Sequence, residues 1–142
     1  MNQLLCLILL CLSFNSHATK LRIVTEDLPP LQLNNHSKPA TGAMVELVRL
    51  MVKEAKLEAT IEVYPWARSY KIAQTEANTL IFSMFRDASR EKLFQWIGKI
   101  YAIDSYLVSL KTRQDIKISS ISNAKKYTVG SIRDDLAENY LI

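Results

Sequence analysis

The chain has 142 residues, a formal net charge of +4 and only two cysteines, Cys6 and Cys11. Its basic residues are scattered through every segment and form no stripe interleaved with aromatic residues, which argues against a nucleic-acid partner. Because both cysteines lie near the amino terminus, we expect no disulfide framework, no thiolate metal site and no cofactor in the rest of the chain.

The first eighteen residues have the pattern of a secretory signal peptide. Leu4–Leu12 is an almost unbroken apolar run, and the polar stretch 13–17 and the small residue Ala18 follow it. We predict that cleavage after Ala18 produces a periplasmic protein that begins at Thr19. A membrane anchor is the alternative, but the apolar run is far shorter than the roughly 20 residues that a spanning helix needs.

Strand and helix patterns alternate between residues 21 and 84. Leu21–Thr25 predicts a strand, because it is a short β-branched run that ends before two prolines. A helix is expected after Gly42, where apolar residues recur on one helical face at Met44, Val45, Val48, Met51, Val52 and Ala55. A second strand at 59–63, a helix at 66–77 and a third strand at 79–84 complete the pattern. This order is typical of an α/β fold with a mainly parallel sheet flanked by helices.

The remaining sequence predicts weaker elements. Two extended stretches are expected at Phe94–Ile103 and Tyr106–Leu110, and a polar stretch follows Lys111. A short helix at 118–126, a strand at Tyr127–Ser131 and a helix from about Asp134 are then predicted. One strand and one helix cannot bury their apolar faces alone, so we expect them either to pack onto the first unit or to need a partner region.

The order of several motifs resembles the bacterial solute-binding protein family 3. A Glu-Asp-Leu-Pro-Pro segment at 26–30 follows the first strand, Thr41-Gly42 opens a helix, and Pro-Trp-Ala-Arg stands at 65–68. Residues 86–91, Arg-Asp-Ala-Ser-Arg-Glu, then precede Phe-Gln-Trp-Ile-Gly at 94–98. The resemblance runs from about Leu21 to the last residue, and it is closest to the branch with a Pro-Trp-x-Arg segment.

That resemblance implies a periplasmic-binding-protein type II fold, a clamp of two lobes. Residues 19–110 would form the first lobe and the start of the hinge, with closure about the segment from Ser105 to Lys111, and residues 111–142 would begin an incomplete second lobe. A small solute, an amino acid or a related carboxylate, would bind between the lobes at the carboxyl ends of the parallel strands. The implied role is reversible capture by a monomer, without catalysis, for an inner-membrane permease of an ABC-type uptake system.

The resemblance also implies which residues contact the solute. Arg90, just after the third strand, would pair with a carboxylate, because a planar guanidinium can donate two parallel charge-assisted hydrogen bonds. The alternative for Arg90 is a surface arginine that pairs with Glu91 or Asp87. Trp66 would form an aromatic wall or belong to the lobe core. The further candidates that line the cleft are Arg86, Arg68, Ser83, Asp27 and Phe85.

Two departures from the family pattern bear on the identity of the solute. Met84 and Phe85 stand where relatives that bind amino acids present a polar side chain, and Leu28 replaces an aromatic residue. An enzyme on the same fold, such as a dehydratase, is one alternative function. The sequence disfavours it, because His36 is the only histidine after residue 18. A module that senses a solute for a signalling receptor is the other alternative, and the sequence does not distinguish sensing from uptake.

Overall fold

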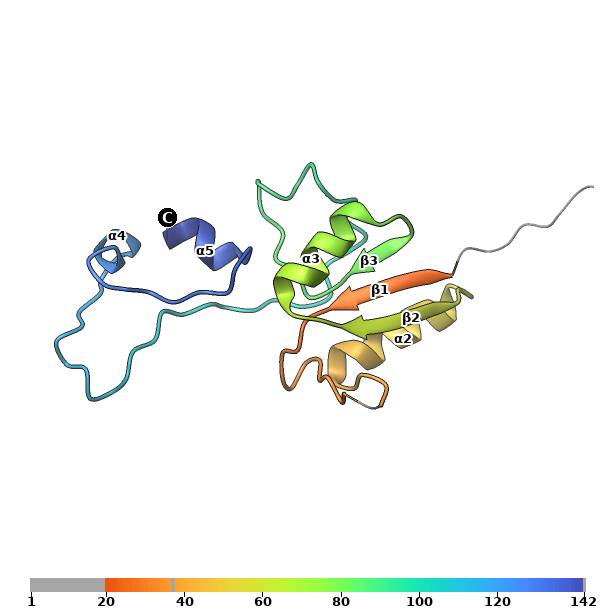
Figure 1. The fold of residues 1–142 in the computed structure, drawn as a ribbon, viewed down its shortest axis with the longest axis horizontal. Helices are drawn as coiled ribbons and strands as arrows, with labels where there is room; N and C mark the ends of the chain where they lie inside the picture. Colours follow the sequence, from red (N-terminus) through yellow and green to blue (C-terminus); the bar gives the residue numbers. More distant parts are fainter. Residues whose placement is uncertain (1–19, 37, 142) are drawn as a thin grey trace, which may run out of the picture.

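The computed structural model describes residues 20–36 and 38–141, so the predicted signal peptide and both cysteines lie outside the described residues. An α/β unit is built around a three-stranded parallel sheet with the strand order β2-β1-β3, which confirms the predicted α/β class with a parallel sheet flanked by helices (Figure 1). No helix within the described ranges is long and apolar enough to cross a membrane. The elements are β1 (Leu21–Thr25), α2 (Ala43–Glu54), β2 (Ala59–Val63), α3 (Trp66–Thr75), β3 (Thr79–Ile81), α4 (Ile121–Ala124) and α5 (Leu136–Leu141).

The first strand of the chain lies in the middle of the sheet. Ile23 is in register with Ile61 of β2 and with Leu80 of β3. Successive side chains of a strand point to opposite faces, so Ile23 and Val24 face different layers, and both are buried. A strand covered on both faces needs apolar side chains on each, which explains the adjacent Ile23 and Val24 in the buried half of β1.

Helix α2 covers one face of the sheet. Val45 and Val48 of α2 pack with Ile23 and Phe82 in the main hydrophobic cluster. The helix begins after Gly42, whose φ is 117°, and a Cβ at this position would lie 2.4 Å from the carbonyl oxygen of Leu31. Glycine is therefore required there, both for the backbone conformation and for the close approach of the preceding loop.

Helix α3 covers the other face and begins at the carboxyl end of the sheet. Trp66, Ser69 and Ile72 are its buried residues. The Ser69 hydroxyl donates a 2.7 Å hydrogen bond to the carbonyl oxygen of Thr25, at the end of β1. This bond ties the first turn of α3 to the end of the central strand, and it places Trp66 at the edge where a parallel sheet commonly binds ligands.

A polar network joins β1 to β2 and to the end of α3. The Arg22 guanidinium donates hydrogen bonds of 2.9 and 3.0 Å to the two carboxylate oxygens of Glu62. It also donates to Glu76 and to the Tyr64 hydroxyl, which itself donates to Glu62. Hydrogen bonding from Arg22 lowers the pKa of Glu62, against the opposing effect of partial burial.

Several predicted boundaries were wrong, for local reasons. Strand β3 ends at Ile81 rather than at Met84, and Ser83 has a positive φ of 60°, which extended backbone does not allow. Helix α3 ends at Thr75 because Glu76 is extended. Helix α5 begins at Leu136, two residues later than predicted, because Asp134 has a left-handed φ of 61°.

The segment from 95 to 141 is much more open than the segment before it. Neither of the predicted extended stretches forms a strand, and Val108 is 90% exposed. The prediction of a strand at Tyr127–Ser131 was wrong, because no described strand lies beside it to accept and donate backbone hydrogen bonds. The predicted short helix is present as α4, and α4 and α5 lie beyond the long connection (Figure 1).

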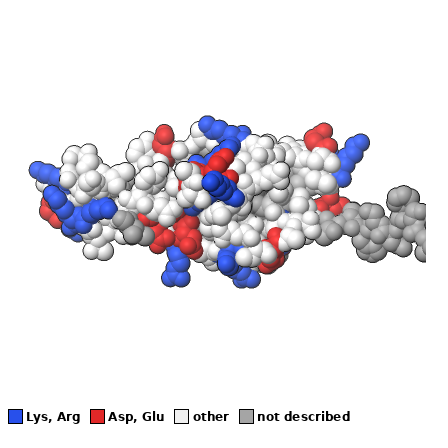
Figure 2. Space-filling model, turned by 90° about the horizontal axis from the view of Figure 1, so that it is seen from above, with Lys and Arg blue, Asp and Glu red and all other residues white. Residues whose placement is uncertain are grey.

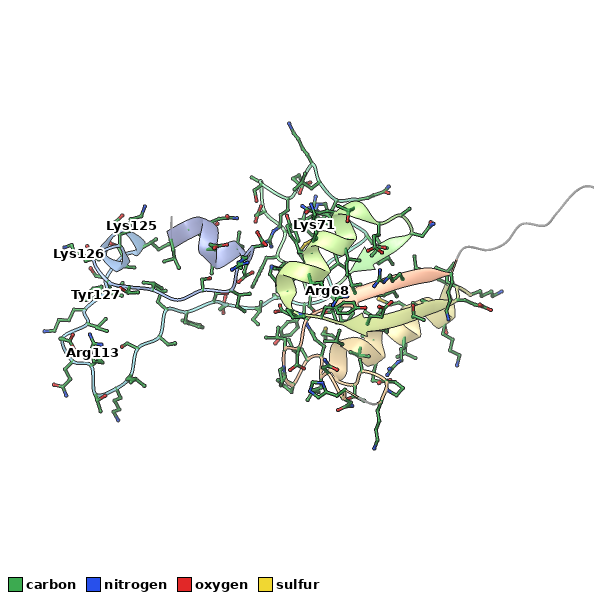
Figure 3. The ribbon with its side chains drawn as sticks, viewed as in Figure 1. Arg68, Lys71, Arg113, Lys125, Lys126 and Tyr127 are labelled. Carbon is green, nitrogen blue, oxygen red and sulfur yellow. The ribbon has the colours of Figure 1, made fainter. Side chains whose placement is uncertain are left out.

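Charged side chains are distributed over both segments. On the face shown in Figure 2, basic and acidic residues are interspersed and separated by wide uncharged areas. Figure 3 shows Arg113, Lys125 and Lys126 near Tyr127 at the outer end of the second segment, whereas Arg68 and Lys71 lie on α3. The basic pair that is densest in the sequence is therefore distant from the carboxyl end of the sheet.

Candidate functional site

The carboxyl ends of the three strands bring together the predicted site residues. Glu26 follows β1, Trp66 begins α3 shortly after β2, and the loop 82–90 follows β3. Parallel strands end at one edge of a sheet, so segments far apart in the sequence meet there. The candidate site is built on this edge.

Arg90 is the most deeply buried charged residue of the described chain, with a relative exposure of 2%. Its Nη2 donates a 2.9 Å hydrogen bond to the carbonyl oxygen of Asp134, and its Nη1 donates one of 3.3 Å to the carbonyl oxygen of Phe85. The nearest carboxylate oxygen is Oδ2 of Asp87, 3.9 Å from Nε, which is too far for a hydrogen bond. The guanidinium is thus buried without a hydrogen-bonded carboxylate partner among the described residues.

Two aromatic rings of α3 pack against this guanidinium. The Cζ atom of Arg90 lies 5.4 Å from the ring centroid of Trp66 and 5.2 Å from that of Tyr70. The two rings stack with their centroids 5.6 Å apart, and Phe94 packs against Tyr70. Such cation–π contacts hold the guanidinium in place. Sequence reasoning missed Tyr70, although its spacing of four residues from Trp66 puts both rings on one helical face.

Trp66 is a hydrogen-bond donor to the same oxygen that Arg90 binds. Its Nε1 donates a 2.9 Å hydrogen bond to the carbonyl oxygen of Asp134. Trp66 is also buried, so it combines the two predicted roles of core residue and site residue with a polar contact that the sequence did not predict. Two donors from α3 and from the loop after β3 therefore converge on one oxygen atom.

A tight turn positions Arg90. Oδ1 of Asp87 accepts hydrogen bonds from the backbone N–H and the hydroxyl of Ser89, and from the backbone N–H of Arg90. Burial opposes the ionisation of Asp87, but the hydrogen bonds from Ser89 and from the backbone of Arg90, together with the positive charge of Arg90, outweigh it and lower the pKa of Asp87. Oδ2 of Asp87 is buried and has no hydrogen-bond partner among the described residues. Asp87 therefore stabilises the turn by hydrogen bonds and also places a negative charge 3.9 Å from Nε of Arg90.

The other two predicted arginines do not reach Arg90. Arg86 donates hydrogen bonds of 2.8 and 2.6 Å to Glu91, and its guanidinium lies 5.3 Å from the ring centroid of Trp96. Of the two alternative partners predicted for Arg90, Glu91 binds Arg86 instead, whereas Asp87 lies within ion-pair distance, 3.9 Å from Nε. Arg90 is buried and is therefore not a surface arginine. Arg68 is exposed and lies over the ring of Tyr64, 4.1 Å from its centroid.

The three remaining predicted residues have different roles at this edge. Asp27 is exposed, and its Oδ1 accepts a 2.7 Å hydrogen bond from the backbone of Asn34, so it stabilises the loop after β1. Ser83 donates a 3.1 Å hydrogen bond to Oε1 of Gln32. Phe85 contributes its backbone carbonyl to Arg90. Of the predicted set, Arg90, Trp66 and Phe85 are therefore in one contact network.

Gln32 is a second residue that sequence reasoning did not identify. It is completely buried, and its Nε2 has no acceptor among the described residues. An unpaired buried amide donor usually costs stability. No simple signal in the sequence marks Gln32, because a glutamine in a loop between prolines and asparagines is usually a surface residue.

Negative charge is concentrated where β1 ends. Burial raises the pKa of the Glu26 carboxyl, and the nearby charges of Asp135 and Asp27 raise it further. Asp135 belongs to the turn before α5, so this repulsion acts between the two segments of the chain, whereas the Asp134 contacts are attractive.

No second candidate site among the described residues includes the predicted site residues. A hollow of about 240 Å³ lies next to α2 and β2, but none of the predicted site residues lines it; its lining is Pro39, Arg49, Val52, Ala59 and Ile61. No group of three or more His, Cys, Asp or Glu side chains within 20–36 and 38–141 is placed to hold a metal ion.

Comparison of the chain with protein-family models, with curated proteins and with solved structures finds no significant match. The function of the chain is therefore inferred from the geometry of the site and from the order of the motifs in the sequence.

Proposed function

We propose that the chain is a periplasmic solute-binding protein of the family 3 type, in which residues 19–110 form the first lobe of the type II fold and the start of its hinge. It captures an amino acid or a related carboxylate for an ABC-type uptake system. The observation that carries the proposal is the convergence of Arg90 Nη2 and Trp66 Nε1 on one oxygen atom, 2.9 Å from each donor.

The chemistry of this arrangement favours an anionic oxygen. A buried cation is costly unless a negative group compensates it, and the Asp87 carboxylate, 3.9 Å from Nε of Arg90, supplies negative charge but accepts no hydrogen bond from the guanidinium. A solute carboxylate would add a negative group that accepts hydrogen bonds directly from Arg90 and Trp66. Charge-assisted hydrogen bonds in a buried site are about twice as strong as neutral ones.

The aromatic rings add geometric selectivity. Trp66 and Tyr70 fix the plane of the guanidinium, so its donors are oriented before the solute arrives. A preorganised site loses less entropy on binding, which raises affinity without new contacts. Lysine in place of Arg90 would keep the charge but lose both the planar fork and the stacking.

The test is a binding screen on the full chain with matched arginine variants. A thermal-shift panel of the twenty amino acids and small dicarboxylates selects the solute, and calorimetry then compares wild type with Arg90→Ala, Arg90→Lys and Arg113→Ala. We expect Arg90→Ala to weaken binding by about 2–5 kcal/mol, because a buried charge-assisted pair is lost. Arg90→Lys should be intermediate. Arg113 is exposed, pairs with Asp115 and lies at the outer end of the second segment, so Arg113→Ala should bind normally (Figure 3).

Equal affinities for wild type and Arg90→Ala would contradict the proposal. Export is tested separately by mass spectrometry of the protein released from the periplasm, where a mature chain that begins at Thr19 is expected.

A further inference from the structure

The oxygen atom that Arg90 and Trp66 bind belongs to the protein itself. It is the backbone carbonyl oxygen of Asp134, which is 44 residues from Arg90 and 68 from Trp66 in the sequence. In Figure 1 the start of α5, just after Asp134, lies on the side of the second segment that faces α3. The site is thus filled by a part of the chain that follows the long connection.

The turn that presents this carbonyl has a defined geometry. Asp134 has a φ of 61°, a left-handed conformation that residues with a Cβ adopt infrequently. Its backbone N–H donates a 2.7 Å hydrogen bond to Oε2 of Glu138 in the first turn of α5. The conformation at Asp134 and the contact to Glu138 together hold the carbonyl toward Arg90.

We propose that the Asp134 turn is an internal competitor of the solute. This inference rests on the proposed function, in which a solute carboxylate binds to Arg90 and Trp66. One oxygen position between these two donors cannot hold the Asp134 carbonyl and a solute oxygen at the same time. Solute binding therefore requires the turn to leave the site.

The difference in charge determines the outcome of this competition. A peptide carbonyl offers only a partial negative charge to the buried guanidinium, whereas a carboxylate offers a full one, so a carboxylate displaces the turn and a neutral carbonyl compound does not. The apparent affinity for the solute is reduced by the fraction of molecules in which the turn occupies the site. Capture of the solute is thereby coupled to the position of the segment that contains α5.

Substitutions of the turn residues shift this competition in opposite directions. Proline at 134 cannot adopt a positive φ, so Asp134→Pro removes the turn from the site and should bind the solute about tenfold more tightly. Glycine adopts a positive φ readily, so Asp134→Gly stabilises the turn and should bind about threefold more weakly. Glu138→Ala removes the acceptor for the Asp134 N–H without changing the turn residue, and it should strengthen binding less than proline does. Glu138→Gln retains an acceptor and is its matched control.

The readout is the nuclear magnetic resonance signal of the Trp66 indole N–H in the full chain. This signal reports directly on the hydrogen bond from Trp66 Nε1 to the Asp134 carbonyl. The probe is acetate, a carboxylate that carries only a methyl group, and acetamide is its neutral counterpart. The indole resonances of Trp66 and Trp96 are distinguished with the Trp96→Phe variant. Without acetate, the Trp66 resonance of Asp134→Pro should differ from that of wild type, because its hydrogen bond to the Asp134 carbonyl is absent.

The outcomes separate the inference from the function on which it rests. Tighter acetate binding by Asp134→Pro and Glu138→Ala, with weaker binding by Asp134→Gly and no effect of acetamide, supports the internal competitor. Acetate affinities in both Asp134→Pro and Glu138→Ala that equal or fall below that of wild type overturn it, even though the site binds carboxylates. If acetate moves the Trp66 resonance in none of the variants, the proposed function fails and the inference fails with it.

Discussion

Residues 20–94 and 95–141 both contain β-branched and aromatic runs, yet only the first segment forms a sheet. Leu21–Thr25 is a strand because β2 and β3 pair with both of its edges. Tyr127–Ser131 has a similar composition, but it has no neighbouring strand among the described residues and remains irregular. The comparison shows that a strand pattern in the sequence becomes a strand only where another segment satisfies its backbone hydrogen bonds.

Burial differs between the two segments in the same way. Ala124 is the only buried residue of the second segment, whereas the first segment buries β1 on both faces beneath α2 and α3. The segments meet through the Arg90 and Trp66 hydrogen bonds to Asp134, and through Trp96 and Ile100 at the start of the second segment. We therefore expect the free energy of unfolding to depend almost entirely on the first segment.

The largest expected effect comes from a pair of isoleucines with opposite burial. Ile23 is 1% exposed in the central strand, and Ile97 is 73% exposed in the long connection. Ile23→Ala should lower the free energy of unfolding by about 2–5 kcal/mol, because it removes buried methyl groups and leaves a cavity. Ile97→Ala should change it by no more than about 0.5 kcal/mol. Urea unfolding followed by circular dichroism measures both, and similar losses would contradict the contrast between the segments.

A pair of glycines sharpens the comparison at the backbone. Gly42→Ala should destabilise the first segment by about 1–3 kcal/mol, because Gly42 has a φ of 117° and its new Cβ would lie 2.4 Å from the Leu31 oxygen. A Cβ on Gly130 would meet no atom within 4 Å, so Gly130→Ala should have almost no effect. Thermal unfolding of both variants is the measurement. A stable Gly42→Ala protein would show that the loop before α2 can move away.

The smallest expected effect concerns pH. The pKa of Glu62 is lowered by Arg22, so the pair contributes stability above the ordinary pKa of glutamate, and this contribution is lost as the pH falls through the lowered value. Glu62→Gln should therefore reduce stability at neutral pH by about 1 kcal/mol or less, since the pair is partly exposed, and should weaken the acid dependence. Asp115→Asn breaks the exposed pair with Arg113 and should leave the unfolding curve unchanged at every pH.

The sequence predicted the parts of the fold that depend on local periodicity. The apolar spacing of 44–55 and the β-branched run of 21–25 predicted α2 and β1 with boundaries close to those observed. Burial of one face of α2 and of both faces of β1 produces these patterns in the sequence. The ends of β3 and α5 were misplaced, since the positive φ angles of Ser83 and Asp134 have no signal in the sequence. When a residue with a Cβ adopts a positive φ, its surroundings in the folded protein impose that backbone conformation.

The candidate site was predicted only in part. Arg90 and Trp66 were identified from the motif order, and the structure brings them together. Tyr70 could have been found from its helical spacing to Trp66. The Asp134 contact could not have been found, because it uses a backbone carbonyl, which every residue has, and joins segments far apart in the sequence.

The central position of β1 also affects the order in which the protein can fold. Of the described strands, β1 is synthesised first and is the middle strand of the sheet, and its second edge is paired only when residues 79–81 are present. Until then, a shorter chain has an open strand edge and an incomplete core, and long-range parallel pairing of this kind is slow to form. We therefore expect the sheet to be incomplete until residues 79–81 have been made, and an incompletely folded chain is what the proposed export would take across a membrane.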